Sequence, residues 1–171
     1  MDSKTRTVLL EILEREGWPE YTNHPLDRGG PTKGGITLSS LRSWRNRPKL
    51  DERELQLLKK EEAISILFYR YVECNGIKKL EEGDLRNNVI DNAVLSGPFL
   101  AVKDLQNAVG VYDDGVIGPI TLKAIQEIGL KRSNRLLAVQ RSLRLAKFVQ
   151  KNPDQLVFLV GWLNRCLEFV K

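Results

Sequence analysis

The residues whose types could do chemistry gather in one stretch of the chain, from Glu16 to Thr37. The stretch holds the carboxylates of Glu16, Glu20 and Asp27, the hydroxyl of Thr32 and the only histidine of the chain. It also holds five glycines and three prolines, which is too much turn chemistry for a helix or a central strand. Polar, glycine-rich loops on rigid elements often carry catalytic residues. We take this stretch as the candidate active site, the alternative being an ordinary surface loop.

The segment before this loop positions Glu16 through its helical period. One face of a predicted helix over 5–16 collects the apolar side chains Val8, Leu9, Ile12 and Leu13. Glu16 follows Ile12 by four residues and so falls on that face, where burial and the negative end of the helix both disfavour a charged carboxylate. The spacing predicts a carboxylic acid that keeps its proton near neutral pH, as a general acid requires. The alternative is a glutamate at the helix end that turns into water.

A longer pattern in the same stretch resembles a known family. Its matching residues are Glu16-Gly17, Tyr21, Asn23, Asp27, Gly29-Gly30, Thr32 and Gly35-Ile36-Thr37. They resemble the signature of glycoside hydrolase family 108, the lysozyme-like N-acetylmuramidases with an EGGY motif. The spacing from Tyr21 to Thr37 fits this signature without gaps. The chain departs from it at Trp18-Pro19-Glu20, where the family has a single glycine, and this two-residue insertion leaves Glu20 as a second candidate acid.

The resemblance implies catalytic roles for three residues. Glycoside hydrolysis needs an acid for the leaving oxygen, and negative charge or an activated water on the other side of the sugar. The resemblance assigns the acid to Glu16, and it implies that Asp27 and Thr32 hold the water or stabilise the oxocarbenium-like state. Asp27 could instead order the glycine turn through an Asx contact. Thr32 and Thr37 could equally cap the loop and the next helix.

Substrate contacts are expected from Tyr21, Asn23 and Thr37. Tyr21 would stack on a sugar ring or attach the loop to the core, and Asn23 would bind an acetamido group or the loop backbone. His24 receives no catalytic role. A single histidine disfavours a zinc site or a Ser-His-Asp arrangement, so we expect no metal and no cofactor.

The second half of the chain contains a helix–turn–helix pattern with Leu-Gln, Asp-Gly, Gly-Pro and Thr-Leu elements. These elements resemble the peptidoglycan-binding module in the C-terminal part of the same family. The resemblance makes Tyr112 and Asp114 candidates for contact with the cell wall. The alternative is a helical hairpin that only packs against the first half. We expect a catalytic region over 1–96 and a binding region over 97–171, packed as one compact unit.

The fold class follows from repeated helical periodicity. We predict a mainly α-helical, lysozyme-like unit of seven or eight helices, with a small β-hairpin near Gly29–Ile36. A long helix is expected from Asp51 to about Cys74. Two C-terminal helices are expected to bury Leu143, Phe148, Val157, Phe158, Val160, Leu163 and Leu167.

Composition limits the partners. The net charge of +5 and the pI near 9.3 suit an acidic partner such as a wall polymer. Basic residues do not form one dense block with interleaved aromatics, which disfavours nucleic acid. Cys74 and Cys166 share no metal-ligand spacing. No secretory h-region and no membrane-length apolar run is visible, so we expect synthesis in the bacterial cytoplasm without stable membrane insertion. A holin or a secretion system would then export the protein, as a monomer, to the wall.

Two functions fit these observations. The first is a peptidoglycan hydrolase that cleaves the β-1,4 bond between N-acetylmuramic acid and N-acetylglucosamine, as a phage endolysin or a secretion-assisting bacterial enzyme. The second is an inactive peptidoglycan-binding or wall-scaffold protein, in which the insertion after Gly17 has disabled the site. Glu16 on an apolar helix face favours the enzyme, because a solvated binding loop gains nothing from it.

Overall fold

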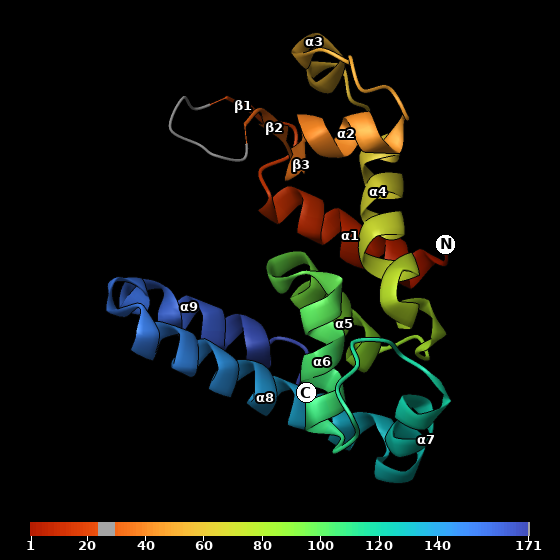
Figure 1. The fold of residues 1–171 in the computed structure, drawn as a ribbon, viewed down its shortest axis with the longest axis vertical. Helices are drawn as coiled ribbons and strands as arrows, with labels where there is room; N and C mark the ends of the chain where they lie inside the picture. Colours follow the sequence, from red (N-terminus) through yellow and green to blue (C-terminus); the bar gives the residue numbers. More distant parts are fainter. Residues whose placement is uncertain (24–29, 171) are drawn as a thin grey trace. The chain divides into compact units, whose positions relative to one another are not determined.

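The computed structural model describes residues 1–23 and 30–170, which form two compact units. The first is Met1–Arg70 and the second is Tyr71–Lys171. A π-helical turn, η1 (Tyr69–Glu73), joins them along the chain. Figure 1 shows that helices dominate both units, as the sequence predicts. The division expected between residues 96 and 97 remains a prediction.

The first unit places a small sheet at the end of its first helix. Its elements are α1 (Ser3–Arg15), β1 (Tyr21–Thr22), β2 (Thr32–Lys33), β3 (Ile36–Thr37), α2 (Leu38–Trp44), α3 (Glu52–Gln56) and α4 (Lys60–Phe68). Asp2 begins α1 by accepting a hydrogen bond from the Thr5 amide at 2.7 Å. The apolar face predicted for this helix is buried, and α1 packs against α4. The first unit therefore supplies a rigid base for the loop.

The three strands form an antiparallel sheet in the order β1-β2-β3. The hairpin predicted near Gly29–Ile36 is confirmed as β2 and β3, whereas the added strand β1 was not predicted. Gly34 and Gly35 form its two-residue turn, with φ angles of 53° and 74°. Both angles are positive, as a tight turn of this kind requires, and glycine adopts them without steric cost.

The long helix predicted from Asp51 to Cys74 is wrong. The chain leaves the helix at Leu57 and begins α4 after Lys59. The Lys33 ammonium group donates to the carbonyl oxygens of Gln56 and Leu58 at this break. Carbonyls at a helix end lack intrahelical partners, so Lys33 satisfies that of Gln56, the last residue of α3, and through Leu58 it ties β2 to the α3–α4 connection.

The second unit is a helical bundle with a long terminal hairpin. Its elements are η2 (Cys74–Lys79), α5 (Asp84–Ser96), α6 (Pro98–Ala108), α7 (Pro119–Ile128), α8 (Leu130–Lys151), η3 (Pro153–Gln155) and α9 (Leu156–Leu167). Helices α5, α6 and α8 pack on one another, and α9 lies along α8 (Figure 1). None of the described helices is long and apolar enough to cross a membrane.

Buried ion pairs connect the helices of the second unit. Asp91 on α5 is 0% exposed, and it accepts from Arg141 on α8 at 2.8 Å and from Arg165 on α9 at 2.9 Å. Arg144 donates to Asp104 on α6 at 2.7 Å. A buried charge without its partner is costly, so these pairs fix how the helices align.

The predicted burial of the C-terminal helices is partly wrong. Val157 and Val160 are 79 and 70% exposed, and Phe158 and Leu167 are also exposed. The same holds for two residues of α8, which are Leu143 and Phe148. The reason is that α9 packs mainly against α8, so only one of its faces is covered. Periodicity identifies an apolar face but does not supply the surface that covers it.

Candidate functional site

Glu16 lies at the C-terminal end of α1, where the helix gives way to the loop. Its amide still donates to the carbonyl of Ile12 at 2.9 Å, but its backbone angles are no longer helical. Gly17 follows with a φ of 81° and turns the chain. The Glu16 side chain is exposed, so the burial predicted from the helical wheel is wrong. The prediction assumes that the helix continues through Glu16, whereas α1 ends at Arg15, so the side chain of Glu16 does not follow the helical period.

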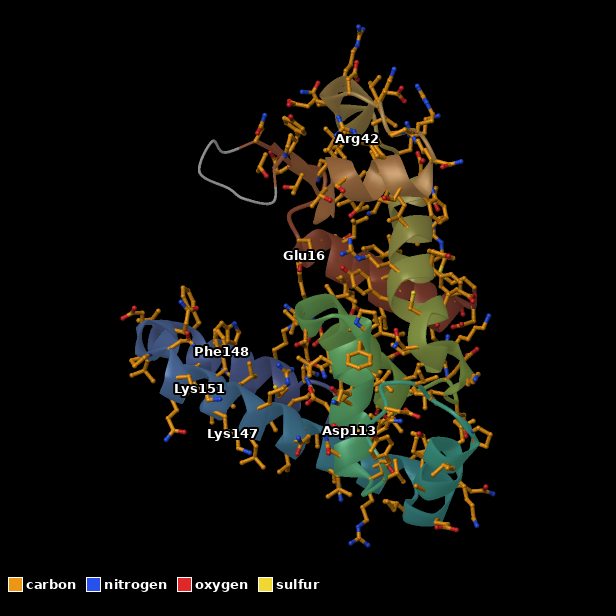
Figure 2. The ribbon with its side chains drawn as sticks, in the orientation of Figure 1. Glu16, Arg42, Asp113, Lys147, Phe148 and Lys151 are labelled. Atoms are coloured by element: carbon orange, nitrogen blue, oxygen red, sulfur yellow. The ribbon has the colours of Figure 1, made fainter. Side chains whose placement is uncertain are left out.

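The hairpin turn lies directly against the Glu16 side chain. A methyl group built on Gly35 would lie 3.2 Å from both Cβ and Cγ of Glu16 and 3.3 Å from its Oε2. The carboxyl group therefore rests over the exposed backbone of the turn, which has no side chain at this point. Figure 2 shows Glu16 at the end of α1 that faces the small sheet. The end of α1 and the hairpin turn together restrict the positions that the Glu16 carboxyl group can adopt.

The inserted residues form a closed turn next to Glu16. The Trp18 amide donates to the Leu13 carbonyl at 3.1 Å, and the Glu20 amide donates to Gly17 at 2.8 Å. The Trp18 ring packs against Gly34, where an added methyl would come within 2.8 Å of it. The Lys33 ammonium lies 5.0 Å from the centre of the same ring, a cation–π contact. The insertion thus holds the hairpin in place, and the Glu20 side chain remains exposed.

Two of the candidate threonines share one row across the sheet. The strand register pairs Thr22 with Thr32 and Thr32 with Thr37, so the three side chains lie on one face. The hydroxyls of Thr22 and Thr32 are 2.8 Å apart. Thr37 caps α2, because its hydroxyl accepts from the Ser40 amide at 3.1 Å. The capping alternative for Thr37 is therefore present in the structure, and Thr32 is the half-buried hydroxyl at the centre of the row.

Tyr21 and Asn23 converge on a carboxylate that sequence reasoning missed. The Tyr21 hydroxyl donates to Oε2 of Glu52 at 2.6 Å, and the Asn23 side-chain amide donates to the same oxygen at 3.2 Å. The hydrogen bond to this carboxylate, helped by partial burial, raises the pKa of Tyr21 above its ordinary value. Glu52 is the first residue of α3, where an acidic side chain is common because it interacts favourably with the positive end of the helix. Only the tertiary fold brings it to the loop.

Asp27, the remaining candidate at this site, lies outside the described residues. The described part of the site therefore contains Glu16 beside the Gly35 turn, the threonine row, and the Tyr21–Asn23–Glu52 cluster. This set offers two exposed carboxyl groups, of which Glu52 already accepts from Tyr21 and Asn23, together with hydroxyl and amide donors and one aromatic ring. Across residues 1–23 and 30–170, no group of three or more metal-binding side chains is placed to hold an ion.

The candidates of the second unit differ in their environment. Asp114 accepts from the Gln106 side chain at 2.7 Å and from the Val116 amide at 2.9 Å, and these bonds lower the pKa of its carboxyl. The buried Gln106 also accepts from the Gly115 amide at 2.8 Å. Asp114 therefore holds the loop between α6 and α7 together. Tyr112 is 85% exposed, which leaves its ring open to a partner.

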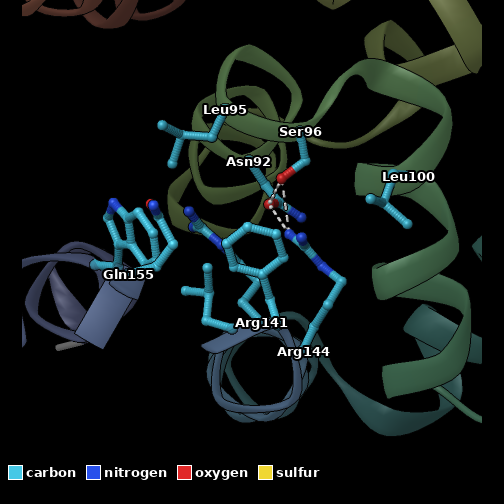
Figure 3. Close-up of a pocket in the computed structure, with 10 residues that line it drawn as sticks. Asn92, Leu95, Ser96, Leu100, Arg141, Arg144 and Gln155 are labelled. Carbon is cyan, nitrogen blue, oxygen red and sulfur yellow. Dashed lines mark hydrogen bonds between the residues drawn. The ribbon is translucent and has the colours of Figure 1, made fainter. Parts of the chain in front are cut away.

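A cavity of about 470 Å³ opens between α5, α6, α8 and α9 (Figure 3). It is lined by Asn92, Leu95, Ser96, Leu100, Arg141, Arg144, Leu145, Phe148, Gln155 and Trp162. Its polar side is already occupied, because Arg144 donates to Ser96 at 2.8 Å and to Asn92 at 3.0 Å. Its aromatic wall pairs Phe148 with Trp162, whose ring centres are 6.1 Å apart. Sequence reasoning missed this cavity because its residues come from separate helices.

Comparisons with known proteins bear on both halves of the chain. A family model described as glycosyl hydrolase 108 matches residues 9–97. A second model, described as a predicted peptidoglycan domain, matches residues 100–167. The solved structure of SagA from Brucella abortus is similar at 31% sequence identity and a TM-score of 0.74, covering 98% of this chain and 95% of that one. No curated protein matched the sequence significantly.

Proposed function

The chain belongs to the glycosyl hydrolase 108 family and is a peptidoglycan hydrolase, and we propose that its reaction is that of an N-acetylmuramidase. The proposed bond is the β-1,4 linkage between N-acetylmuramic acid and N-acetylglucosamine. One observation supports this proposal above the others. The Glu16 carboxyl group lies against the backbone of Gly35, so an acid is held at a fixed place between a helix end and a hairpin. A fixed, accessible acid is what cleavage of a glycosidic bond requires.

In the proposed mechanism Glu16 donates its proton to the glycosidic oxygen as the bond to that oxygen breaks. A bound glycan would cover the exposed Glu16 carboxyl group and exclude water from it, which strengthens its interaction with the glycosidic oxygen. A water then adds through its oxygen to the anomeric carbon and releases a proton, so that one proton returns to the Glu16 carboxylate and the reaction consumes one water.

The residues around the acid are proposed to orient the sugar. Thr32 presents a hydroxyl at the centre of the sheet face and would position a water or a sugar hydroxyl. Asp27 keeps its proposed role in holding the water or stabilising positive charge at the sugar ring. Tyr21, Asn23 and Thr37 are proposed substrate contacts, with Glu52 holding the first two in place.

The inserted turn supports activity in this proposal. An insertion that disabled the site would be expected to separate the hairpin from Glu16. Instead Trp18 packs on Gly34 and beneath the Lys33 ammonium, so the inserted residues contact the hairpin that carries Thr32. The alternative of an inactive wall-binding protein therefore has no described contact in its favour.

Exchange of single carboxyl groups tests the proposed acid. Glu16→Gln keeps shape and most hydrogen bonding but removes the transferable proton, and general acid catalysis typically contributes about 10²–10⁴-fold. We expect release of reducing ends from purified peptidoglycan to fall by at least that factor. Glu14→Gln is the matched control, because Glu14 is an exposed glutamate on the same helix, two residues away. Activity lost in Glu20→Gln but kept in Glu16→Gln would move the acid to the inserted turn.

The finer biological role is also part of the proposal. We propose that the catalytic region over 1–96 works with the wall-binding region over 97–171, where Tyr112 supplies an exposed contact. The enzyme would act on the wall as a monomeric phage endolysin or secretion-assisting hydrolase, released by a holin or a secretion system. Lysis of the producing cells only when a holin is co-expressed would support the endolysin role. Lysis that is equally fast without a holin would contradict that role.

A further inference from the structure

The outward face of α9 is apolar where the solvent face of a helix is usually polar. Leu156, Val157, Val160 and Leu167 are 61, 79, 70 and 57% exposed. They recur at helical spacing, and no residue from 155 to 164 is charged. Single exposed aliphatic residues need no explanation, but a run of them along one helix face marks an interaction surface.

Basic residues outnumber acidic ones in the helical hairpin that carries this face. Residues 130–171 contain nine lysines and arginines against two acidic residues, whereas residues 1–129 contain eighteen against twenty. Helix α8 itself has seven basic residues and no acidic one, and two of the seven, Arg141 and Arg144, are paired with Asp91 and Asp104. Lys147 and Lys151 are exposed near the turn that leads to α9 (Figure 2), and Asp154 in that turn is the nearest acidic residue in the sequence.

Aromatic residues join the two helices at the same end. Trp162 stacks on Phe158 with ring centres 5.8 Å apart, and it contacts Phe148 at 6.1 Å. Both phenylalanines are about half exposed, at 53 and 45%. Aromatic rings are enriched where protein meets the boundary between lipid headgroups and acyl chains.

The combination of these features selects among possible occupants. A wall glycan would be attracted by the cations, but its polar sugars would not bury an uncharged aliphatic face. A second copy of the chain would cover the aliphatic residues but would bring two strongly cationic hairpins together. An anionic bilayer satisfies both features, because cations face headgroup phosphates while aliphatic side chains enter the acyl boundary.

We propose that the α8–α9 end, defined as Lys147, Lys151, Leu156, Val157 and Val160, docks on an anionic lipid bilayer. Helix α9 would lie in the plane of the interface. Its 12 residues are too few to span a bilayer, so the contact is peripheral. Such docking would hold the hydrolase at a membrane surface beside the wall, which is a property separate from cleavage of the glycan.

Vesicle sedimentation of the full chain tests this docking. We expect binding to vesicles of phosphatidylglycerol and phosphatidylethanolamine, weakening as salt is added, and little binding to phosphatidylcholine. Val157→Asp should lower partitioning by roughly tenfold or more, since burial of one aliphatic side chain contributes about 1.5–3 kcal/mol. Lys147→Gln and Lys151→Gln should each lower it roughly fivefold, because a basic residue near an anionic surface contributes about 1 kcal/mol.

Matched control variants come from α7. Ile120→Asp changes an aliphatic residue that is 73% exposed, and Lys123→Gln removes a cation whose side chain is 76% exposed. Both should bind like the unaltered protein. Equal binding to both kinds of vesicle, no binding, or equal losses in Val157→Asp and Ile120→Asp would overturn the proposal. A dimer that Val157→Asp dissociates would assign the face to a second copy instead.

Hydrolysis of lipid-free peptidoglycan separates this inference from the proposed reaction. Val157→Asp should release reducing ends at the unaltered rate, because α9 holds neither a residue proposed for cleavage nor the proposed wall contact, Tyr112. Loss of vesicle binding with intact hydrolysis supports the docking surface. Intact vesicle binding in Val157→Asp overturns it, whatever the outcome of the Glu16→Gln experiment.

Discussion

The contact between Gly35 and Glu16 predicts how a single methyl group should affect activity. Gly35→Ala places a Cβ 3.2 Å from the Cβ and Cγ of Glu16 and 3.3 Å from its Oε2, closer than ordinary van der Waals contact. The side chain or the turn must move by a few tenths of an ångström. A misplacement of 1 Å can cost about 10²-fold in rate, so we expect roughly a tenfold loss in kcat/KM.

The same substitution carries a backbone cost that must be separated from the steric one. Gly35 has a φ of 74°, where a residue with a Cβ costs roughly 1–2 kcal/mol. Gly110 has a φ of 73°, and an added methyl there meets nothing within 4 Å. Gly110→Ala therefore carries the free-energy cost of the positive φ angle without a steric contact. Both variants should lose stability by similar amounts, roughly 2–4 °C in Tm for each kcal/mol.

Turbidity clearing of purified peptidoglycan, with reducing-end release as the second readout, measures the effect. We expect Gly35→Ala to lose activity and Gly110→Ala to keep it at a temperature well below both melting points. If Gly35→Ala cleaves at the unaltered rate, Glu16 is not positioned by the hairpin in the active enzyme. Equal activity losses in the two variants would show that backbone strain alone explains the result.

Three further results are expected. Tyr21→Phe should raise KM more than it lowers kcat, because it removes the Tyr21 hydrogen bond to Glu52 and loosens the loop entry rather than removing the acid; an unchanged KM would contradict this role. Asp114 has a lowered pKa, so its contribution to stability is present above the unfolded value of about 3.9 and is lost as pH falls through the lower folded value. Asp114→Asn should therefore weaken the fall in Tm that the unaltered protein shows on acidification, and an unchanged slope would argue against it. Burial raises the pKa of the Cys166 thiol, so iodoacetamide should modify the partly exposed Cys74 first, and faster labelling of Cys166 in the native protein would contradict its burial.

The parts of the fold that could be predicted depend on neighbours in the sequence. The apolar face of α1 follows from the period of its own residues, and the two-residue turn of the hairpin follows from Gly34-Gly35. Thr37 was predicted as a possible helix cap and Asp51 as the start of a helix, and both accept the amide hydrogen bond that defines a cap. In each case the physical cause lies within four residues, so the sequence alone contains it.

The parts that could not be predicted depend on contacts between distant residues. Glu52 reaches Tyr21 across 31 positions, and nothing near either residue signals the pairing. At the break before α4, two carbonyls accept from Lys33, which comes from the distant strand β2. The exposure of Glu16 has a more local cause, because a helical wheel cannot show that the helix ends one residue earlier.

Chemical identification of the new chain ends in purified, lipid-free peptidoglycan tests the central claim most directly. After digestion and borohydride reduction, a muramidase that uses Glu16 as its acid yields reduced N-acetylmuramic acid, and Glu16→Gln yields at least about 10²-fold less. Reduced N-acetylglucosamine would assign the enzyme to the other glycosidic bond, and anhydro ends would show intramolecular attack in place of hydrolysis. Full yield of reduced N-acetylmuramic acid from Glu16→Gln would contradict the assignment of the acid.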